Sequence, residues 1–227
     1  MKILASGCSF TAGKNTWPSY VLPDAEVVNL AVVAAGNQYI SQSVIAEMAQ
    51  NQYDLVLVMW SGLMRKDLQI SDTTYQQLEA PIYRKKINNM SFACVGNMRA
   101  GISDSRFAKY KQEYFELVDE ESSACQSLLH IIALESFLKN KKIPYRFMSY
   151  INYWKDQEKL INLNFGVHKH PTSSTLAECI DYDNFLFYNQ QESFYEFAKN
   201  KELLEEDNFH PTRPAHQAWG EWIGTQI

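Results

Sequence analysis

The chain has 227 residues, of which 46% are hydrophobic and 21% charged, and its formal net charge is −5 at pH 7. This size and composition are typical of a globular protein with one sizeable core. The acidic balance and the lack of long basic runs argue against nucleic-acid binding. No run approaches the roughly 20 apolar residues of a membrane helix, so no membrane association is expected.

The N-terminal quarter of the chain alternates between strands and a helix. Apolar runs at residues 2–6, 25–31 and 54–60 predict three strands. The third run is continuously apolar, which is typical of a central parallel strand buried on both faces. Between the second and third strands, apolar residues recur at helical spacing over residues 40–48 and predict a helix with one buried face.

Two long segments lack clear periodicity. Residues 66–108 contain proline, glycine and several asparagines and serines, and residues 155–189 are mixed and rich in aromatic side chains. Segments of this length without regular structure are unusual inside a compact domain. We therefore expect two excursions from a single domain spanning residues 1–227, the first lying over the carboxyl edge of the sheet.

The remaining segments complete an α/β pattern. A helical pattern over residues 109–140, as one helix or as two joined near residues 121–123, precedes a fourth strand at residues 143–150. Helices are expected at residues 192–200 and 214–223. Strands that alternate with helices in this way predict a three-layer α/β/α sandwich with a mostly parallel central sheet.

Three residues have the chemistry of a nucleophile, a base and an orienting acid. Ser9 lies in the turn that follows the first strand, within Gly7-Cys8-Ser9-Phe10-Thr11. Asp207 and His210 lie three residues apart, just before the last helix. In such an arrangement the carboxylate can hydrogen-bond one imidazole nitrogen, which leaves the other nitrogen free to take a proton from a serine.

The order of the motifs resembles the SGNH hydrolase superfamily, also called GDSL esterases and lipases. Gly-x-Ser-x-Thr follows the first strand, Gly36-Asn37 the second and Ser61-Gly62 the third, and Asp-x-x-His-Pro precedes the last helix. The resemblance implies the same flavodoxin-like three-layer fold. It also implies that Ser9 is the nucleophile and that Asp207 and His210 complete a catalytic triad.

The resemblance further implies an oxyanion hole made by the backbone N–H groups of Ser9 and Gly36. Preorganised donors of this kind stabilise the negative oxygen of a tetrahedral intermediate by several kcal/mol. The family usually supplies a third donor from an Asn side chain, but Met64 stands at that place and methionine cannot donate a hydrogen bond. Three residues near the carboxyl edge of the sheet are candidates for the missing donor: Asn37, Ser61 and Arg65.

The four cysteines, Cys8, Cys94, Cys125 and Cys179, are widely spaced and form no Cys-x-x-Cys motif. Neither a disulfide framework nor a metal or cofactor site is expected, and Cys8, where the family has a structural aspartate, is expected to be a compact buried residue. The first apolar run breaks at Gly7, which is too early for the core of a signal peptide, so a cytoplasmic location is expected.

These observations predict an ester hydrolase that forms an acyl-enzyme on Ser9, of the carboxylesterase or carbohydrate O-acetylesterase type, acting on a small-molecule or glycan ester. An O-acyltransferase would use the same triad, with a sugar hydroxyl in place of water. A non-catalytic or glycan-binding protein on the same scaffold is the alternative from another class. Nothing in the sequence separates hydrolase from acyltransferase or defines the oligomeric state.

Overall fold

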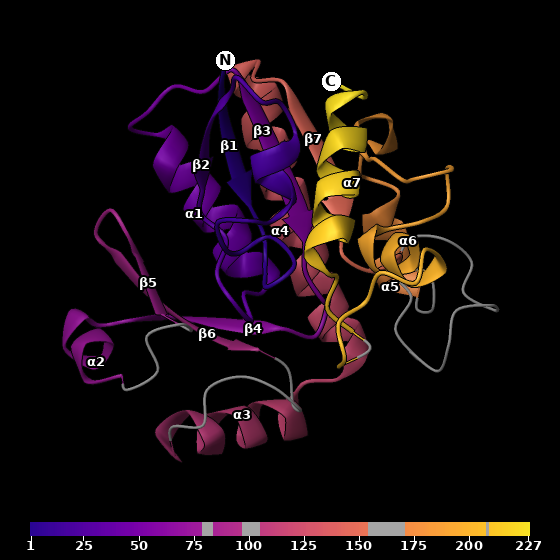
Figure 1. The fold of residues 1–227 in the computed structure, drawn as a ribbon. Helices are drawn as coiled ribbons and strands as arrows, with labels where there is room; N and C mark the ends of the chain where they lie inside the picture. The colour runs from indigo at the N-terminus through magenta and orange to yellow at the C-terminus, as the bar shows by residue number, and fades with distance from the viewer. Residues whose placement is uncertain (79–83, 97–104, 154–170, 208) are drawn as a thin grey trace.

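The computed structural model describes residues 1–78, 84–96, 105–153, 171–207 and 209–227 (Figure 1). Two sheets are present in these ranges, one of four strands and one of three. The expectation of a single domain stays a prediction.

Four parallel strands form the central sheet, in the order β2-β1-β3-β7. They are β1 (Lys2–Ser6), β2 (Glu26–Asn29), β3 (Leu55–Trp60) and β7 (Tyr145–Ser149). Every residue of β3 is buried, because this inner strand is covered on both faces. The four strands expected from apolar runs are therefore confirmed, with slightly shorter ends at three of them.

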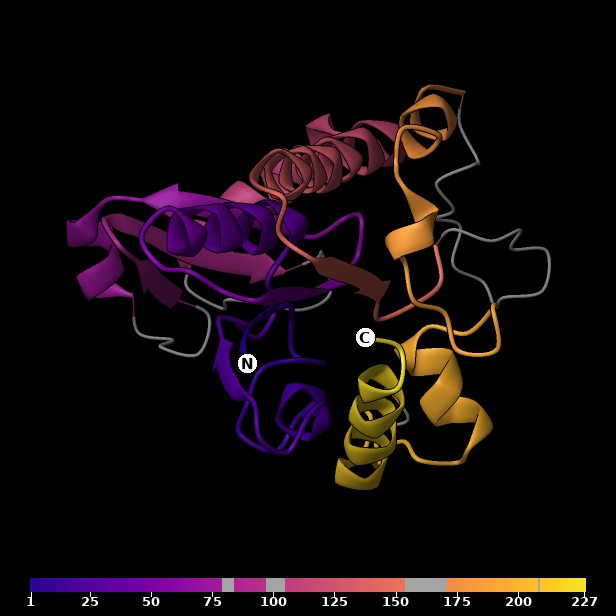
Figure 2. The ribbon, with the colours of Figure 1, turned by 90° about the horizontal axis from the view of Figure 1, so that it is seen from above.

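Helices cover both faces of this sheet (Figure 2). α1 (Asn37–Met48) and α4 (Glu120–Lys141) pack together on one face. The short 3-10 helix η1 (Trp17–Tyr20) and α7 (Arg213–Gly224) pack together on the other. The predicted α/β class, with a parallel sheet flanked by helices, is confirmed.

The packing of α7 against η1 depends on two glycines of α7. A Cβ atom added to Gly220 would overlap the carbonyl oxygen of Trp17, and one added to Gly224 would overlap that of Val21. The side chains of Trp17 and Trp219 are fully buried beside this contact. The absence of a side chain at two positions one turn apart thus lets the last helix lie directly on the backbone near η1.

The first expected excursion contains regular structure that the sequence pattern did not indicate. β4 (Lys66–Ile70), β5 (Arg84–Ile87) and β6 (Met90–Gly96) form an antiparallel sheet in the order β4-β6-β5, and α2 (Asp72–Gln77) lies between β4 and β5 in the chain. This sheet projects beside the carboxyl end of the parallel sheet (Figure 1). The short, polar strands Lys-Asp-Leu-Gln-Ile and Arg-Lys-Lys-Ile lack the alternation that would have revealed them.

The long helical pattern proves to be two helices, α3 (Ser105–Leu117) and α4. The break falls at residues 118–119, slightly before the expected joint. Asp119 is the N-cap of α4 and its side chain accepts a hydrogen bond from the Ser122 N–H at 2.7 Å. The helix ends at Lys141, and the left-handed conformation of the C-cap residue Lys142 (φ 56°) stops its propagation.

The C-terminal part holds α5 (Pro171–Ala177), a 3-10 turn η3 (Tyr182–Asn184) and α6 (Phe194–Asn200). The first half of the second expected excursion, residues 155–170, lies outside the described residues. The two helices expected near the C-terminus are observed as α6 and α7. Among the residues that the structure describes, no helix combines the length and apolarity needed to cross a bilayer.

Candidate active site

Ser9 lies in a tight turn at the carboxyl end of β1. The backbone N–H groups of Thr11 and Ala12 both donate to the Cys8 carbonyl oxygen at 2.9 Å, which closes the turn. A Cβ atom on Gly7 would overlap the Thr11 side chain, whose Oγ1 accepts a hydrogen bond from Trp17 Nε1 at 3.1 Å. The Gly-x-Ser-x-Thr spacing therefore folds threonine over glycine, and this places Ser9 between them at the sheet edge.

Asp207 organises the loop that carries His210. Its Oδ1 accepts the backbone N–H groups of Phe209 at 2.9 Å and His210 at 2.8 Å. Its Oδ2 lies 2.5 Å from His210 Nδ1. The hydrogen bond to the His210 side chain makes the largest contribution, and the two backbone hydrogen bonds add to it, so that the pKa of Asp207 is lowered to about 2. The carboxylate is therefore ionised at neutral pH, and both of its oxygens are used to fix the imidazole.

The two loops meet across 201 residues of sequence. His210 Nε2 lies 3.3 Å from Ser9 Oγ. Because an ionised carboxylate can accept hydrogen bonds but cannot donate them, His210 Nδ1 carries the proton and Nε2 is left as an acceptor for the serine hydroxyl. The structure thus brings together Ser9, His210 and Asp207, in the order that a nucleophile, a base and an orienting acid require.

Aromatic rings pack against one side of the His210 imidazole. The Phe10 ring centroid lies 5.4 Å and the Phe209 centroid 5.2 Å from that of His210, and Tyr150 lies 4.9 Å from Phe10. Phe10 is fully buried, whereas the His210 side chain is 43% exposed. The base is therefore held on one side by packed rings and remains accessible on the other.

Gly36 is placed differently from the expectation. Its N–H donates to Asp67 Oδ1 at 2.8 Å, and the Tyr39 N–H donates to Asp67 Oδ2 at 2.7 Å. The first amides of α1 need an acceptor, and Asp67 from β4 supplies it. Burial of Asp67 raises its pKa to about 6 despite these bonds. The amide expected to face an oxyanion is thus occupied by a carboxylate in this structure.

Asn37 and Ser61 form a buried link between α1 and the end of β3. The Ser61 N–H donates to Asn37 Oδ1 at 2.8 Å, and Asn37 Nδ2 donates to the Ser61 carbonyl oxygen at 3.3 Å. Both residues are at most 1% exposed, and the Ser61 hydroxyl has no hydrogen-bond partner among the described residues. Of the three candidate donors, Asn37 is therefore occupied by its hydrogen bonds to the Ser61 backbone, and the Ser61 hydroxyl is buried beside that contact.

Arg65 lies at the same edge of the sheet, among two tyrosines that the sequence interpretation did not select. Its guanidinium carbon is 5.3 Å from the centroid of the Tyr150 ring, and Tyr153 donates its hydroxyl to the Tyr150 oxygen at 2.9 Å. Burial raises the pKa of both tyrosines, which keeps their hydroxyls protonated. Their position in the sequence was the available signal, since Tyr150 ends the fourth predicted strand and Tyr153 lies just after it.

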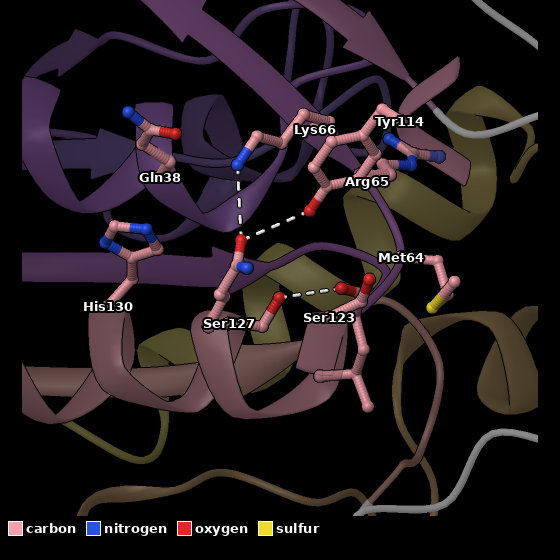
Figure 3. A pocket seen from close by; sticks show the side chains of 10 residues that line it. Gln38, Met64, Arg65, Lys66, Tyr114, Ser123, Ser127 and His130 are labelled. Carbon is pink, nitrogen blue, oxygen red and sulfur yellow. Dashed lines mark hydrogen bonds between the residues drawn. The ribbon is translucent and has the colours of Figure 1, made fainter. Parts of the chain in front are cut away.

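Met64 lines a shallow pocket on the α4 side of the segment that joins β3 to β4 (Figure 3). There Lys66 Nζ donates to Gln126 Oε1 at 3.2 Å, and Ser127 Oγ donates to the Leu63 carbonyl oxygen at 2.8 Å. Within the described ranges, no three side chains of His, Cys, Asp or Glu are grouped closely enough to hold a metal ion.

His216, in the first turn of α7, has a structural role. It is 7% exposed, and its Nδ1 accepts the Trp17 N–H at 3.3 Å, which ties α7 to the start of η1. Burial, with a smaller contribution from His210, lowers the pKa of His216 to about 4. An accepting Nδ1 requires the neutral ring, so protonation of His216 opposes folding.

We expect this histidine to make the protein less stable in acid. Its folded pKa is below the usual value of 6.5, so its contribution is complete above pH 6.5 and is lost as the pH falls toward 4. The shift corresponds to about 3 kcal/mol. Denaturant unfolding of the wild type and His216→Asn, whose amide oxygen can still accept the Trp17 N–H, should show a flatter pH dependence for the variant. Equal slopes between pH 6.5 and 4 would contradict the assignment.

The fold is similar to that of solved esterase structures. The esterase EstA from Pseudoalteromonas sp., in a structure inhibited by monoethylphosphonate, is 11% identical over 99% of this chain and 94% of its own, with a TM-score of 0.50. An acetyl xylan esterase is 9% identical over 100% of both chains, with a TM-score of 0.49. A lipolytic G-D-S-L family protein from Desulfitobacterium hafniense is 13% identical over 100% of this chain and 99% of its own, with a TM-score of 0.45.

Residues 11–227 match the sequence profile of a family of unknown function, DUF6071, and the chain belongs to that family. No curated protein matches the sequence. At 11% identity the similarity to EstA establishes a shared fold, and the function has to be argued from the site itself.

Proposed function

We propose that the protein is a serine esterase that hydrolyses carboxylic esters, with Ser9 as nucleophile, His210 as general base and acid, and Asp207 as the orienting acid. The observation that carries the proposal is the 3.3 Å approach of His210 Nε2 to Ser9 Oγ, while Asp207 holds the opposite ring nitrogen. This is the arrangement in which a neutral serine is activated by an adjacent base.

The reaction proceeds in two steps. His210 Nε2 takes the Ser9 proton as Oγ bonds to the ester carbonyl carbon, and the tetrahedral intermediate collapses when the leaving alcohol receives that proton from His210. Water then gives a proton to His210 and attacks the acyl-enzyme, and Ser9 recovers the proton as the acid leaves. Asp207 stabilises the imidazolium in both steps, and the Ser9 N–H is the backbone donor proposed for the oxyanion.

A small acyl group fits the site best, because packed aromatic rings close one side of His210. Phe10, Phe209 and Tyr150 occupy that side, and the centroids of the Tyr150 and Phe209 rings lie 6.1 Å apart. The alcohol part of the ester, whether a small molecule or a glycan, would leave through the exposed side. We therefore propose short-chain esters, acetyl esters included, as the substrate class.

Covalent labelling tests the proposal. We expect a fluorophosphonate probe to label the wild type and not Ser9→Ala, because the probe traps an activated serine. Hydrolysis of p-nitrophenyl acetate should fall to background in the same variant. Ser122→Ala, which changes an exposed serine in the first turn of α4, should label and hydrolyse like the wild type. Labelling that survives in Ser9→Ala, or no hydrolysis by the wild type, would refute the proposal.

A further inference from the structure

The proposed oxyanion hole lacks two of its three expected donors. Met64 carries no hydrogen-bond donor in its side chain. The Gly36 N–H donates to Asp67 Oδ1 at 2.8 Å, and a Cβ at Gly36 would lie 2.8 Å from the Arg65 carbonyl oxygen, so this segment is closely packed in place. With the Ser9 N–H as the sole donor, the negative charge that develops on the carbonyl oxygen would be only partly stabilised by hydrogen bonds.

Arg65 lies across the end of the sheet where that charge would form. Its Nη1 donates to the Ala35 carbonyl oxygen at 3.5 Å, and its guanidinium carbon lies over the Tyr150 ring at 5.3 Å. Ala35 follows β2 and Tyr150 follows β7, which are the two outer strands. Segments that follow both outer strands therefore converge on the guanidinium, and the turn that carries Ser9 follows the inner strand β1, which lies between these outer strands.

The same strand pair is the switch point of the sheet. The chain leaves β1 toward β2 on one side, whereas β3 is followed by β7 on the other. Loops that diverge in this way open a crevice between two strands, and ligands of open α/β sheets bind there. Ser9 lies in the loop after β1 and Arg65 in the loop after β3, so both residues belong to the loops that border this crevice.

Most N–H donors of the Arg65 guanidinium are available for a further hydrogen bond. An arginine side chain has five N–H donors. Within the part of the chain that the structure describes, its hydrogen bonding consists of the long contact to Ala35, and no carboxylate forms an ion pair with it. The nearby carboxylate of Asp67 has both oxygens engaged, by the Gly36 and Tyr39 amides. Arg65 is thus a half-buried cation that forms no close ion pair with a described carboxylate, although the charge of Asp67 acts on it at longer range.

We propose that Arg65 is a catalytic residue that donates a charge-assisted hydrogen bond to the oxyanion formed on Ser9, in the role of the missing Asn donor. The proposal rests on the proposed esterase function. A guanidinium is a stronger donor to an oxyanion than a neutral amide, because one partner of the bond is fully charged. It would therefore offset the loss of both the Asn side chain and the Gly36 amide.

Kinetics with a neutral ester test the role. In Arg65→Ala we expect kcat for p-nitrophenyl acetate to fall by about 10²–10³-fold with KM little changed, because the donor acts on charge that develops only in the transition state. Added guanidinium chloride at non-denaturing concentration should restore part of kcat in Arg65→Ala. Lys66→Met, which removes the neighbouring cation that contacts Gln126, should retain wild-type kinetics and show no rescue.

The outcomes separate this proposal from the one it rests on. If the wild type shows no hydrolysis that depends on Ser9, the esterase function fails. If the wild type is active and Arg65→Ala keeps its kcat for p-nitrophenyl acetate, the oxyanion role of Arg65 is overturned. A loss confined to KM for an ester with a carboxylate, such as mono-p-nitrophenyl succinate, would also overturn it and identify Arg65 as a substrate-anchoring group. A loss of kcat without rescue, accompanied by a lower unfolding temperature, would overturn it in favour of a structural role.

Discussion

Replacing His210 with alanine is expected to reduce kcat for ester hydrolysis by about 10⁴–10⁶-fold, because His210 is the group that would take the Ser9 proton. Among the described residues, His216 is a second histidine in this region, but it is buried and uses its Nδ1 to accept the Trp17 N–H. Steady-state hydrolysis of p-nitrophenyl acetate measures the loss. The backbone of the loop should persist, since the carbonyl of residue 210 accepts the Glu205 N–H at 2.7 Å whatever the side chain.

The double variant Ser9→Ala, His210→Ala sharpens this expectation. Groups that act as one unit show strongly non-additive losses, so the double variant should be no less active than either single variant. His130→Gln, on α4, serves as the control for losing a half-buried imidazole elsewhere and should leave kcat unchanged. Losses that multiply in the double variant would show that Ser9 and His210 act independently.

Asp207→Asn is expected to lower kcat by about 10⁴-fold while leaving the loop folded. Asp207 Oδ1 accepts two backbone N–H groups, and an asparagine oxygen can keep both bonds. The asparagine NH₂ then faces His210 Nδ1, which must accept instead of donate. The proton moves to Nε2, and the ring presents a donor to Ser9 where an acceptor is needed.

Thermal unfolding and kinetics together decide this prediction. The unfolding temperature of Asp207→Asn should stay near that of the wild type, because Asp207 is 49% exposed and its backbone bonds are preserved. Glu205→Gln, an exposed acid on the same loop, should change neither property. An Asp207→Asn enzyme with near-wild-type kcat would show that the carboxylate does not set the tautomer of His210.

The central sheet could be predicted from sequence because its signal is local. The unbroken apolar run of β3 and the short run of β1 indicate buried parallel strands without knowledge of their neighbours. The antiparallel sheet could not, because β4 and β5 are short, polar and defined by pairing with β6. The stability of this sheet comes from contacts between strands, and such contacts cannot be inferred from the residues of one strand alone.

The candidate site divides in the same way. Ser9, Asp207 and His210 are marked by spacing within short motifs, and the structure places them in contact. The partner of Gly36 could not be found from its neighbours in the chain, since Asp67 reaches α1 from another element, 31 residues away. Motif spacing therefore indicated the proposed reacting groups, but which amides are free to meet an oxyanion depends on tertiary hydrogen bonds.

The contact between α7 and η1 has a consequence for how the protein can lose its proposed activity. The proposed nucleophile, Ser9, lies in the turn after the inner strand β1, whereas the proposed base, His210, lies in the loop that leads into α7. Local opening costs less free energy than global unfolding wherever an element rests on few contacts. If α7 lifts from the backbone that Gly220 and Gly224 allow it to touch, His210 leaves Ser9 while the sheet stays folded. Because Ala215, Trp219 and Ile223 of α7 are fully buried, this opening would expose part of the core, and the geometry of the proposed catalyst is therefore as stable as the packing of the last helix.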